Sequence, residues 1–162
     1  MKKIYIIRHA KSSWKDMDLE DFDRPLNKRG ELNAPLMGKR LKKKSVVPDI
    51  ILSSSALRAK TTAKMIAKEL QYSQKIVFKD DMYHTNVIFL HKMLKHLDDK
   101  HTTVFLFGHN SELNMLAEYY VDLEENIPTC GIVEIEFSSK KWSGISSKNA
   151  TLLSFDYPKK EN

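Results

Sequence analysis

Short apolar runs alternate along the chain with segments in which apolar residues recur at helical spacing. Four of the runs are continuous and rich in Ile, Val, Leu and Phe, which is typical of strands buried on both faces. The strands are expected over Lys3–Ile7, Asp49–Ser53, Lys75–Phe78, Thr103–Phe107, Ile132–Phe137 and Thr151–Phe155.

Between these runs, apolar positions at three- and four-residue spacing predict four helices. In the second of them, Leu57, Met65 and Ile66 are expected on the buried face. The helices are expected over Lys28–Lys43, Ala56–Leu70, Val87–Leu97 and Ser111–Tyr120.

The alternation of strands and helices predicts an α/β protein. We expect a three-layer α/β/α sandwich around a mainly parallel sheet of about six strands. The last two strands are joined across residues 138–149 without a helical pattern, so they should form an antiparallel hairpin at one edge of the sheet. No internal repeat and no shift in composition divides the chain, so residues 1–162 are expected to form one domain.

Composition narrows the class of protein. Hydrophobic residues make up 41% of the chain, which is typical of a folded globule. No apolar run approaches the ~20 residues that a membrane-spanning helix needs, so no membrane association is expected. The single cysteine, Cys130, excludes an internal disulfide and fits a reducing cytoplasm, where we expect the protein to reside.

Basic residues outnumber acidic residues by 27 to 21, a net charge of +6. Such a charge attracts nucleic acid, small phosphorylated ligands or acidic partner proteins. The run Lys39–Lys44 is expected to be a solvated helix end, where cations complement the helix dipole. Basic and aromatic residues do not interleave as they do in single-strand-binding proteins, and zinc-finger spacing is absent. We therefore expect no nucleic-acid partner.

Cationic and imidazole side chains follow the ends of three predicted strands. Arg8 and His9 follow the first strand, and His109 follows the fourth strand after Gly108. Arg58 lies in the first turn of the next helix after the second strand, where a cation is unfavourable unless an anion is bound. Ligands bind at the carboxyl ends of parallel strands, so these side chains are expected to surround a phosphoryl group.

Four segments of the chain, in order along residues 3–110, resemble the motifs of the histidine phosphatase superfamily. Within that superfamily, the sequence is most similar to the small SixA-type phosphohistidine phosphatases. The segments are Arg8-His9-Ala10-Lys11 for the Arg-His-Gly signature, Asp23-Arg24-Pro25-Leu26 with Gly30 for the second motif, Ser53 to Thr62 for the arginine motif, and Gly108-His109-Asn110 for the second histidine.

The resemblance implies a phosphoglycerate mutase-like fold and a catalytic role for four residues. His9 would be the nucleophile and would be transiently phosphorylated. Arg8, Arg58 and His109 would line the phosphate pocket and stabilise charge on the phosphoryl oxygens. The chemistry implied is phosphoryl transfer by positioning and electrostatics, with no metal and no other cofactor.

Three further residues are expected to bind substrate on the same resemblance: Lys15, Arg24 and Asn110. Lys15 stands where mutase-like relatives carry an asparagine that contacts phosphate, so the lysine would supply charge with a different geometry. Ala10 replaces the glycine of the signature, a small change that the SixA-like group tolerates.

The resemblance leaves the proton donor open. Mutase-like relatives carry a glutamate after the third strand, in the region that here spans Asp80 to Thr85. His84 falls at the position of that acid and is the expected donor, with Asp81 and solvent as the alternatives. A phosphorus–nitrogen bond to imidazole is labile and can be protonated by solvent, so the missing glutamate favours phosphohistidine over phosphate esters.

These features together predict a phosphohistidine phosphatase that acts on a phosphorylated protein such as a histidine phosphotransfer domain. The chain lacks the length for the helical caps of larger relatives, so we expect an open site and a monomer. Two alternatives stay open. One is a broad-specificity phosphomonoesterase for small phosphorylated molecules, and the other is a non-enzymatic phosphate-binding or interaction module.

Overall fold

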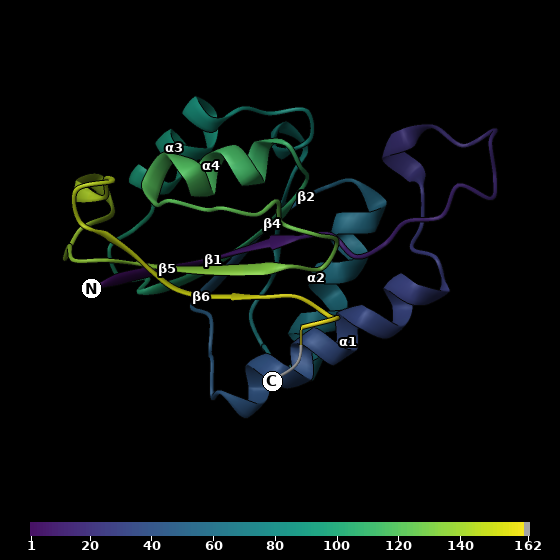
Figure 1. Ribbon diagram of the computed structural model, residues 1–162, viewed down its shortest axis with the longest axis horizontal. Coiled ribbons are helices and arrows are strands. Elements are labelled where there is room, and N and C mark those ends of the chain that lie inside the picture. Colours follow the sequence, from purple (N-terminus) through teal and green to yellow (C-terminus); the bar gives the residue numbers. More distant parts are fainter. Residues whose placement is uncertain (161–162) are drawn as a thin grey trace.

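The computed structural model describes residues 1–160, which form one six-stranded sheet in the order β3-β2-β4-β1-β5-β6 (Figure 1). β3, β2, β4 and β1 are parallel neighbours, whereas β5 runs antiparallel to β1 and to β6. The expected parallel sheet with an antiparallel edge is therefore confirmed. The strands are β1 (Lys2–Arg8), β2 (Ile50–Ser54), β3 (Val77–Lys79), β4 (Thr103–Gly108), β5 (Ile132–Phe137) and β6 (Ala150–Asp156).

Helices cover both faces of the sheet, with α1 and α2 on one face and α3 and α4 on the other (Figure 1). The three-layer arrangement is as expected. One short 3₁₀ helix, η3 (Trp142–Gly144), lies in the β5–β6 connection, where we had expected no helix. The four α-helices are α1 (Lys28–Lys43), α2 (Leu57–Glu69), α3 (Val87–Lys95) and α4 (Glu112–Tyr120).

Strand β1 shows why its sequence is a continuous apolar run. Successive side chains of a strand point to opposite faces, so both faces must be apolar when helices cover both. Ile4 and Ile6 pack into the core beneath α3 and α4, while Tyr5 and Ile7 pack into the core beneath α1 and α2. All four side chains are buried, so β1 lies at the centre of the protein.

The buried face of α2 includes Ile66 as expected, with Met65 packed against it, but it does not include Leu57. Leu57 is 38% exposed, whereas its neighbour Arg58 is buried. The face that packs inward consists mainly of small residues, Ala59 and Ala63 among them, and these allow α2 to lie close to the sheet and to α1. Because Leu57 is apolar, we expected it to face the sheet. In the structure α2 is turned about its axis so that Arg58 is buried and Leu57 is exposed.

Strand pairing brings the carboxyl ends of β1, β2 and β4 to one edge of the sheet. Arg8 pairs with Gly108, and the His9 main-chain N–H donates to the Gly108 carbonyl over 3.1 Å. The start of α1 approaches the same edge, because a Cβ at Gly30 would collide with the carbonyl oxygen of Lys11. This close approach requires glycine and explains its place in the second motif. Among residues 1–160, no helix is long and apolar enough to cross a membrane.

Candidate active site

His9 is buried at the end of β1, and one of its ring nitrogen atoms is hydrogen-bonded within the protein. Its Nδ1 lies 2.7 Å from the carbonyl oxygen of Ala10, which can only accept, so Nδ1 carries the proton and donates it. Nε2 therefore keeps its lone pair. Burial lowers the pKa of His9 to about 4, although the Ala10 hydrogen bond opposes this, and the charges of Arg58 and Arg8 lower it further. The ring is neutral at pH 7 and has the form that a nucleophile requires.

His109 lies beside His9, with ring centroids 5.2 Å apart. Its Nε2 is 2.8 Å from the hydroxyl oxygen of Ser54, which also accepts a hydrogen bond from the Ala56 main-chain N–H. The Ser54 hydroxyl is then free to donate to Nε2, which leaves the proton of the neutral ring on Nδ1. Burial, followed by the nearby His9 and Arg58, lowers the pKa of His109 to about 3, so the ring is neutral at pH 7.

Two buried nitrogen atoms at this site have no hydrogen-bond partner. They are Nε of Arg8 and Nδ1 of His109, and within residues 1–160 no other buried side-chain nitrogen or oxygen lacks one. Arg8 is held in place by an Nη1 hydrogen bond of 2.9 Å to the Ile127 carbonyl. Burial and the charge of Arg58 lower the pKa of Arg8. Because buried polar groups are normally satisfied, these two donors indicate a place for a ligand acceptor.

Arg58 is also buried, and its guanidinium is bound to Asp21 of the short helix η1 (Asp21–Asp23). Arg58 donates from Nη1 to the Asp21 carbonyl over 2.6 Å and from Nη2 to Oδ2 over 2.9 Å. Arg24 donates to Oδ1 over 2.9 Å, and the Tyr83 hydroxyl donates to Oδ2 over 2.6 Å. Burial raises the pKa of Asp21, but the hydrogen bonds from Tyr83 and the two arginines outweigh it and hold the pKa well below its usual range. Asp21 is thus ionised.

Arg24 and Lys15, two expected substrate ligands, lie on the loop between β1 and α1. Arg24 donates to the Ser13 carbonyl over 3.0 Å and to the Ser12 hydroxyl over 2.7 Å, and its Cζ lies 3.2 Å from the centroid of the Trp14 ring. It shares the Asp21 carboxylate with Arg58, so it is close to the site, but its donors are used to order the loop. The Lys15 side chain is exposed.

Asn110, the third expected substrate ligand, has both ends of its amide engaged within the protein. Its Nδ2 donates to the Ile127 carbonyl over 2.9 Å, and its Oδ1 accepts from the Asn114 main-chain N–H over 3.1 Å. The Ile127 carbonyl is also the acceptor for Arg8. Asn110 and Arg8 therefore fix the same main-chain group, and Asn110 acts on the position of the loop before β5.

Of the two side chains considered as proton donors, His84 is brought to the site. Its ring lies 3.9 Å from the Tyr83 ring, which in turn lies 5.5 Å from His109, and its charge lowers the pKa of His109. Its main chain has a φ of 53°, which is uncommon outside glycine. Asp81 is exposed in the short helix η2 (Asp80–Met82).

Three residues at the site were not predicted in their observed roles: Asp21, Tyr83 and Ser54. Asp21 and Tyr83 are 62 positions apart and meet only through the fold. The position of Asp21 three residues before Arg24 was a weak signal for an ion pair. Ser54 belongs to the segment from Ser53 to Thr62 that resembles the arginine motif, and its contact with His109 depends on the pairing of β2 with β4.

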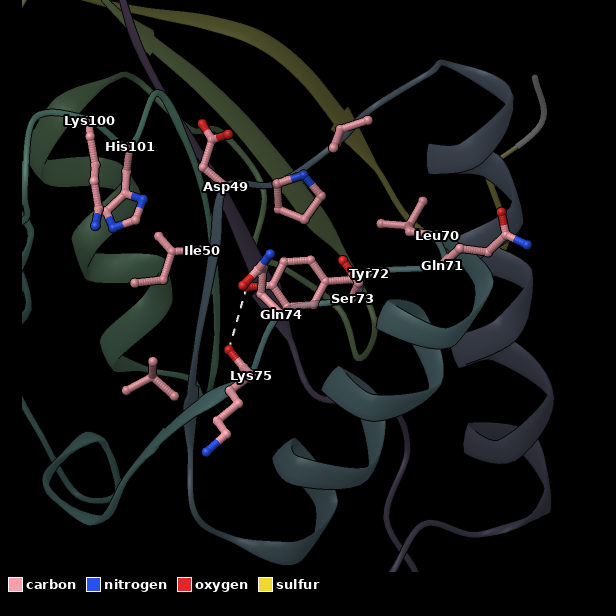
Figure 2. A pocket seen from close by; sticks show the side chains of 13 residues that line it. Asp49, Ile50, Leu70, Gln71, Tyr72, Ser73, Gln74, Lys75, Lys100 and His101 are labelled. Atoms are coloured by element: carbon pink, nitrogen blue, oxygen red, sulfur yellow. Dashed lines mark hydrogen bonds between the residues drawn. The ribbon is translucent and has the colours of Figure 1, made fainter.

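A groove of about 870 Å³ lies away from these residues (Figure 2). Its lining includes Asp49 and Ile50 at the start of β2, Lys100 and His101 before β4, and Tyr72 after α2. It is therefore at the amino ends of the parallel strands, opposite His9. None of the predicted site residues lines it. Within residues 1–160, no group of three or more His, Cys, Asp or Glu side chains could hold a metal ion.

The sequence matches a protein-family model and an uncharacterised relative of similar length. The model of the histidine phosphatase superfamily (branch 1) matches residues 4–85, which include His9 and Arg58. An uncharacterised protein of Mycobacterium tuberculosis is 26% identical over 166 residues, which cover 94% of this chain and 100% of the relative.

Solved structures give the same result for the fold. A structure assigned as the phosphohistidine phosphatase SixA of Agrobacterium tumefaciens is 25% identical, with a TM-score of 0.83 over 97% of this chain and 98% of that chain. The protein histidine phosphatase SixA solved with tungstate is 21% identical, with a TM-score of 0.83 over 96% of this chain and 97% of the other.

Proposed function

Because the chain belongs to the histidine phosphatase superfamily (branch 1), we propose that it is a phosphatase that works through a phosphohistidine intermediate on His9. The observation that carries the proposal is the pair of unpartnered donors, Arg8 Nε and His109 Nδ1, beside a neutral His9. An oxyanion that accepts from both would satisfy the two buried nitrogen atoms and lie next to a nucleophile.

In the first step, Nε2 of His9 attacks phosphorus in line with the leaving group. The bond from phosphorus to Nε2 forms while the bond to the leaving group breaks, and the leaving atom takes a proton from His84 or from solvent. Arg8, Arg58 and His109 hold the phosphoryl oxygens during the transfer. In the second step, water attacks the phosphorus and the bond to Nε2 breaks. Inorganic phosphate leaves, and His9 returns to its neutral form.

The substrate that the site favours is phosphohistidine in a protein, for which a histidine phosphotransfer domain is a suitable example. Its phosphorus–nitrogen bond needs no strong acid, which fits a site where a histidine stands at the position of the family's glutamate. The similarity to the protein histidine phosphatase SixA supports the same substrate class. The single cysteine, Cys130, is buried and suits a reducing compartment, and we place the reaction in the cytoplasm, with the protein acting as a monomer.

A second candidate, phosphomonoesterase activity on small molecules, is favoured by one observation. His84 lies against Tyr83 near His109, where a protonated imidazole could supply the acid that an alkoxide leaving group needs. The two candidates are separated by turnover of a phosphohistidine-containing protein and of para-nitrophenyl phosphate under the same conditions. We expect faster turnover of the phosphohistidine protein, and activity on the ester alone would contradict the proposed substrate.

A further inference from the structure

Some hydrogen-bond donors of the candidate phosphate site have no partner, whereas others are already bound within the protein. Arg8 Nε and His109 Nδ1 are buried and unpartnered. By contrast, both terminal nitrogen atoms of Arg58 are bound to Asp21, at 2.6 Å to its carbonyl oxygen and 2.9 Å to its carboxylate. The Arg58 guanidinium, which is expected to bind the phosphoryl group, is therefore already hydrogen-bonded to two oxygen atoms of Asp21.

The Asp21 carboxylate meets the donors that suit an anion. Arg24 and Arg58 approach its two oxygens, each at 2.9 Å, and the Tyr83 hydroxyl donates over 2.6 Å. Carboxylate and phosphate present similar oxygen pairs to an arginine fork, so either group can occupy the same guanidinium. Asp21 thus stands where a ligand oxygen would bind Arg58.

The two partners of this ion pair differ in how firmly the fold holds them. Arg58 is buried at the first turn of α2, and its side chain is 9% exposed, whereas the Asp21 side chain is 44% exposed. Asp21 lies on the segment between β1 and α1, which projects beyond the sheet as the purple arm in Figure 1. Displacement of the carboxylate would therefore move a surface loop and leave the core packing intact.

We propose that Asp21 is a specificity-determining residue that competes with ligand oxygens for Arg58. An anion gains the full set of donors only after it displaces the carboxylate. Free phosphate and small anions, which contact little else, would bind weakly and be released readily as products. A phosphoryl group on a protein carrier can offset the displacement through contacts with the exposed loop. This inference rests on the proposed function and deepens it toward protein substrates.

Asp21 could instead serve to orient Arg58, and the two roles predict opposite effects of its loss on phosphate binding. If the carboxylate serves only to orient Arg58, its loss leaves the guanidinium disordered, and phosphate binding becomes weaker. If it competes with the ligand, its loss frees Arg58 and phosphate binding becomes stronger.

The test is calorimetric titration of the full-length protein with inorganic phosphate. We expect Asp21→Asn to bind phosphate about tenfold more tightly than the wild type, because one charged competitor for Arg58 is removed. The matched control is Asp23→Asn, which removes the same charge from an exposed position in η1 and should change the affinity little. Tyr83→Phe removes one hydrogen bond to Asp21 and leaves the carboxylate, so it should tighten binding by a smaller factor.

The same substitution should change steady-state kinetics in a defined way. With para-nitrophenyl phosphate, Asp21→Asn should lower KM and strengthen inhibition by the phosphate product, with little gain in kcat. If the wild type binds phosphate clearly and Asp21→Asn binds it equally or more weakly, Asp21 does not compete with the ligand for Arg58. The proposed phosphatase function is unaffected by that result. If neither protein binds phosphate, this inference fails, and the proposed function is decided separately by whether His9 acquires a phosphoryl group during turnover.

Discussion

Nε2 of His109 lies 2.8 Å from the hydroxyl oxygen of Ser54, and this contact determines which ring nitrogen of His109 offers a proton to the site. The hydroxyl oxygen also accepts from the Ala56 main-chain N–H, and within residues 1–160 Nε2 is the one acceptor that its own proton contacts, so the hydroxyl donates to Nε2. Nδ1 is then a buried donor without a hydrogen-bond partner. Ser54, just before α2, thereby sets the tautomer of His109, just after β4.

Loss of the Ser54 hydroxyl should therefore reduce catalysis more than substrate binding. We expect Ser54→Ala to lower kcat about tenfold, because the neutral ring is then free to adopt the tautomer with no proton on Nδ1. The control is Ser53→Ala, whose hydroxyl donates to the Ser54 carbonyl. Steady-state kinetics with a phosphohistidine protein checks this prediction. Equal kcat values in Ser54→Ala and Ser53→Ala would show that the contact is only structural.

Loss of either arginine expected to hold the phosphoryl group, the buried Arg58 or the partly buried Arg8, should cost far more activity than loss of an exposed arginine. Hydrogen bonds to charged groups are each worth roughly 1.5–3 kcal/mol, so loss of Arg8 or Arg58 should lower kcat/KM at least about 100-fold. Arg29→Gln, an exposed residue at the start of α1, is the matched control and should leave kcat/KM nearly unchanged. A loss of less than about threefold in Arg8→Gln would argue against a phosphate-binding role.

The stability of the protein should fall as the pH decreases from neutral. The ordinary pKa of histidine is 6.5, and that of folded His9 is about 4, so between these values the unfolded chain binds a proton that the folded chain does not. Stability is therefore lost through this window, by about 2 to 3 kcal/mol for His9, and His109 contributes in the same direction.

Urea denaturation at pH 7 and pH 4.5 measures this loss. In His9→Ala, the drop between the two pH values should be smaller than in the wild type, because one shifted histidine is absent. A drop of the same size in both proteins would mean that the pKa of His9 is not lowered.

Arg24 should act mainly through the loop that it orders. It donates to Ser12, Ser13 and Asp21 and stacks on Trp14. We expect Arg24→Ala to lower the free energy of unfolding by about 2 kcal/mol, with hydrogen exchange increasing in residues 12–24. If Arg24 instead binds substrate directly, KM rises while exchange in this loop stays as in the wild type.

Most of the fold could be predicted from the sequence because its central strands are continuous apolar runs and two of its helices begin at clear capping residues. Asn27 and Asn86 cap α1 and α3, and these helices begin where expected. The observed ends of the strands lie within two residues of the expected ones. Small shifts of this kind have no effect on the site, because strand pairing fixes the edge at which the strands end.

The site was predictable only where the chemistry stood out against the local pattern. Arg8 and His9 interrupt an apolar run, and Arg58 occupies a helix start that disfavours cations. Asp21 and Tyr83 gave no such signal, because each is ordinary in its own loop and gains its role from contacts across 62 positions of the chain.

The phosphohistidine intermediate proposed for His9 is tested most directly by detection of phosphate bound to His9 during turnover. The wild type should acquire an acid-labile, base-stable phosphoryl group that mass spectrometry locates on His9, and His9→Ala should acquire none. Turnover without any such group on His9, or the same labelling in His9→Ala, would contradict the proposed intermediate.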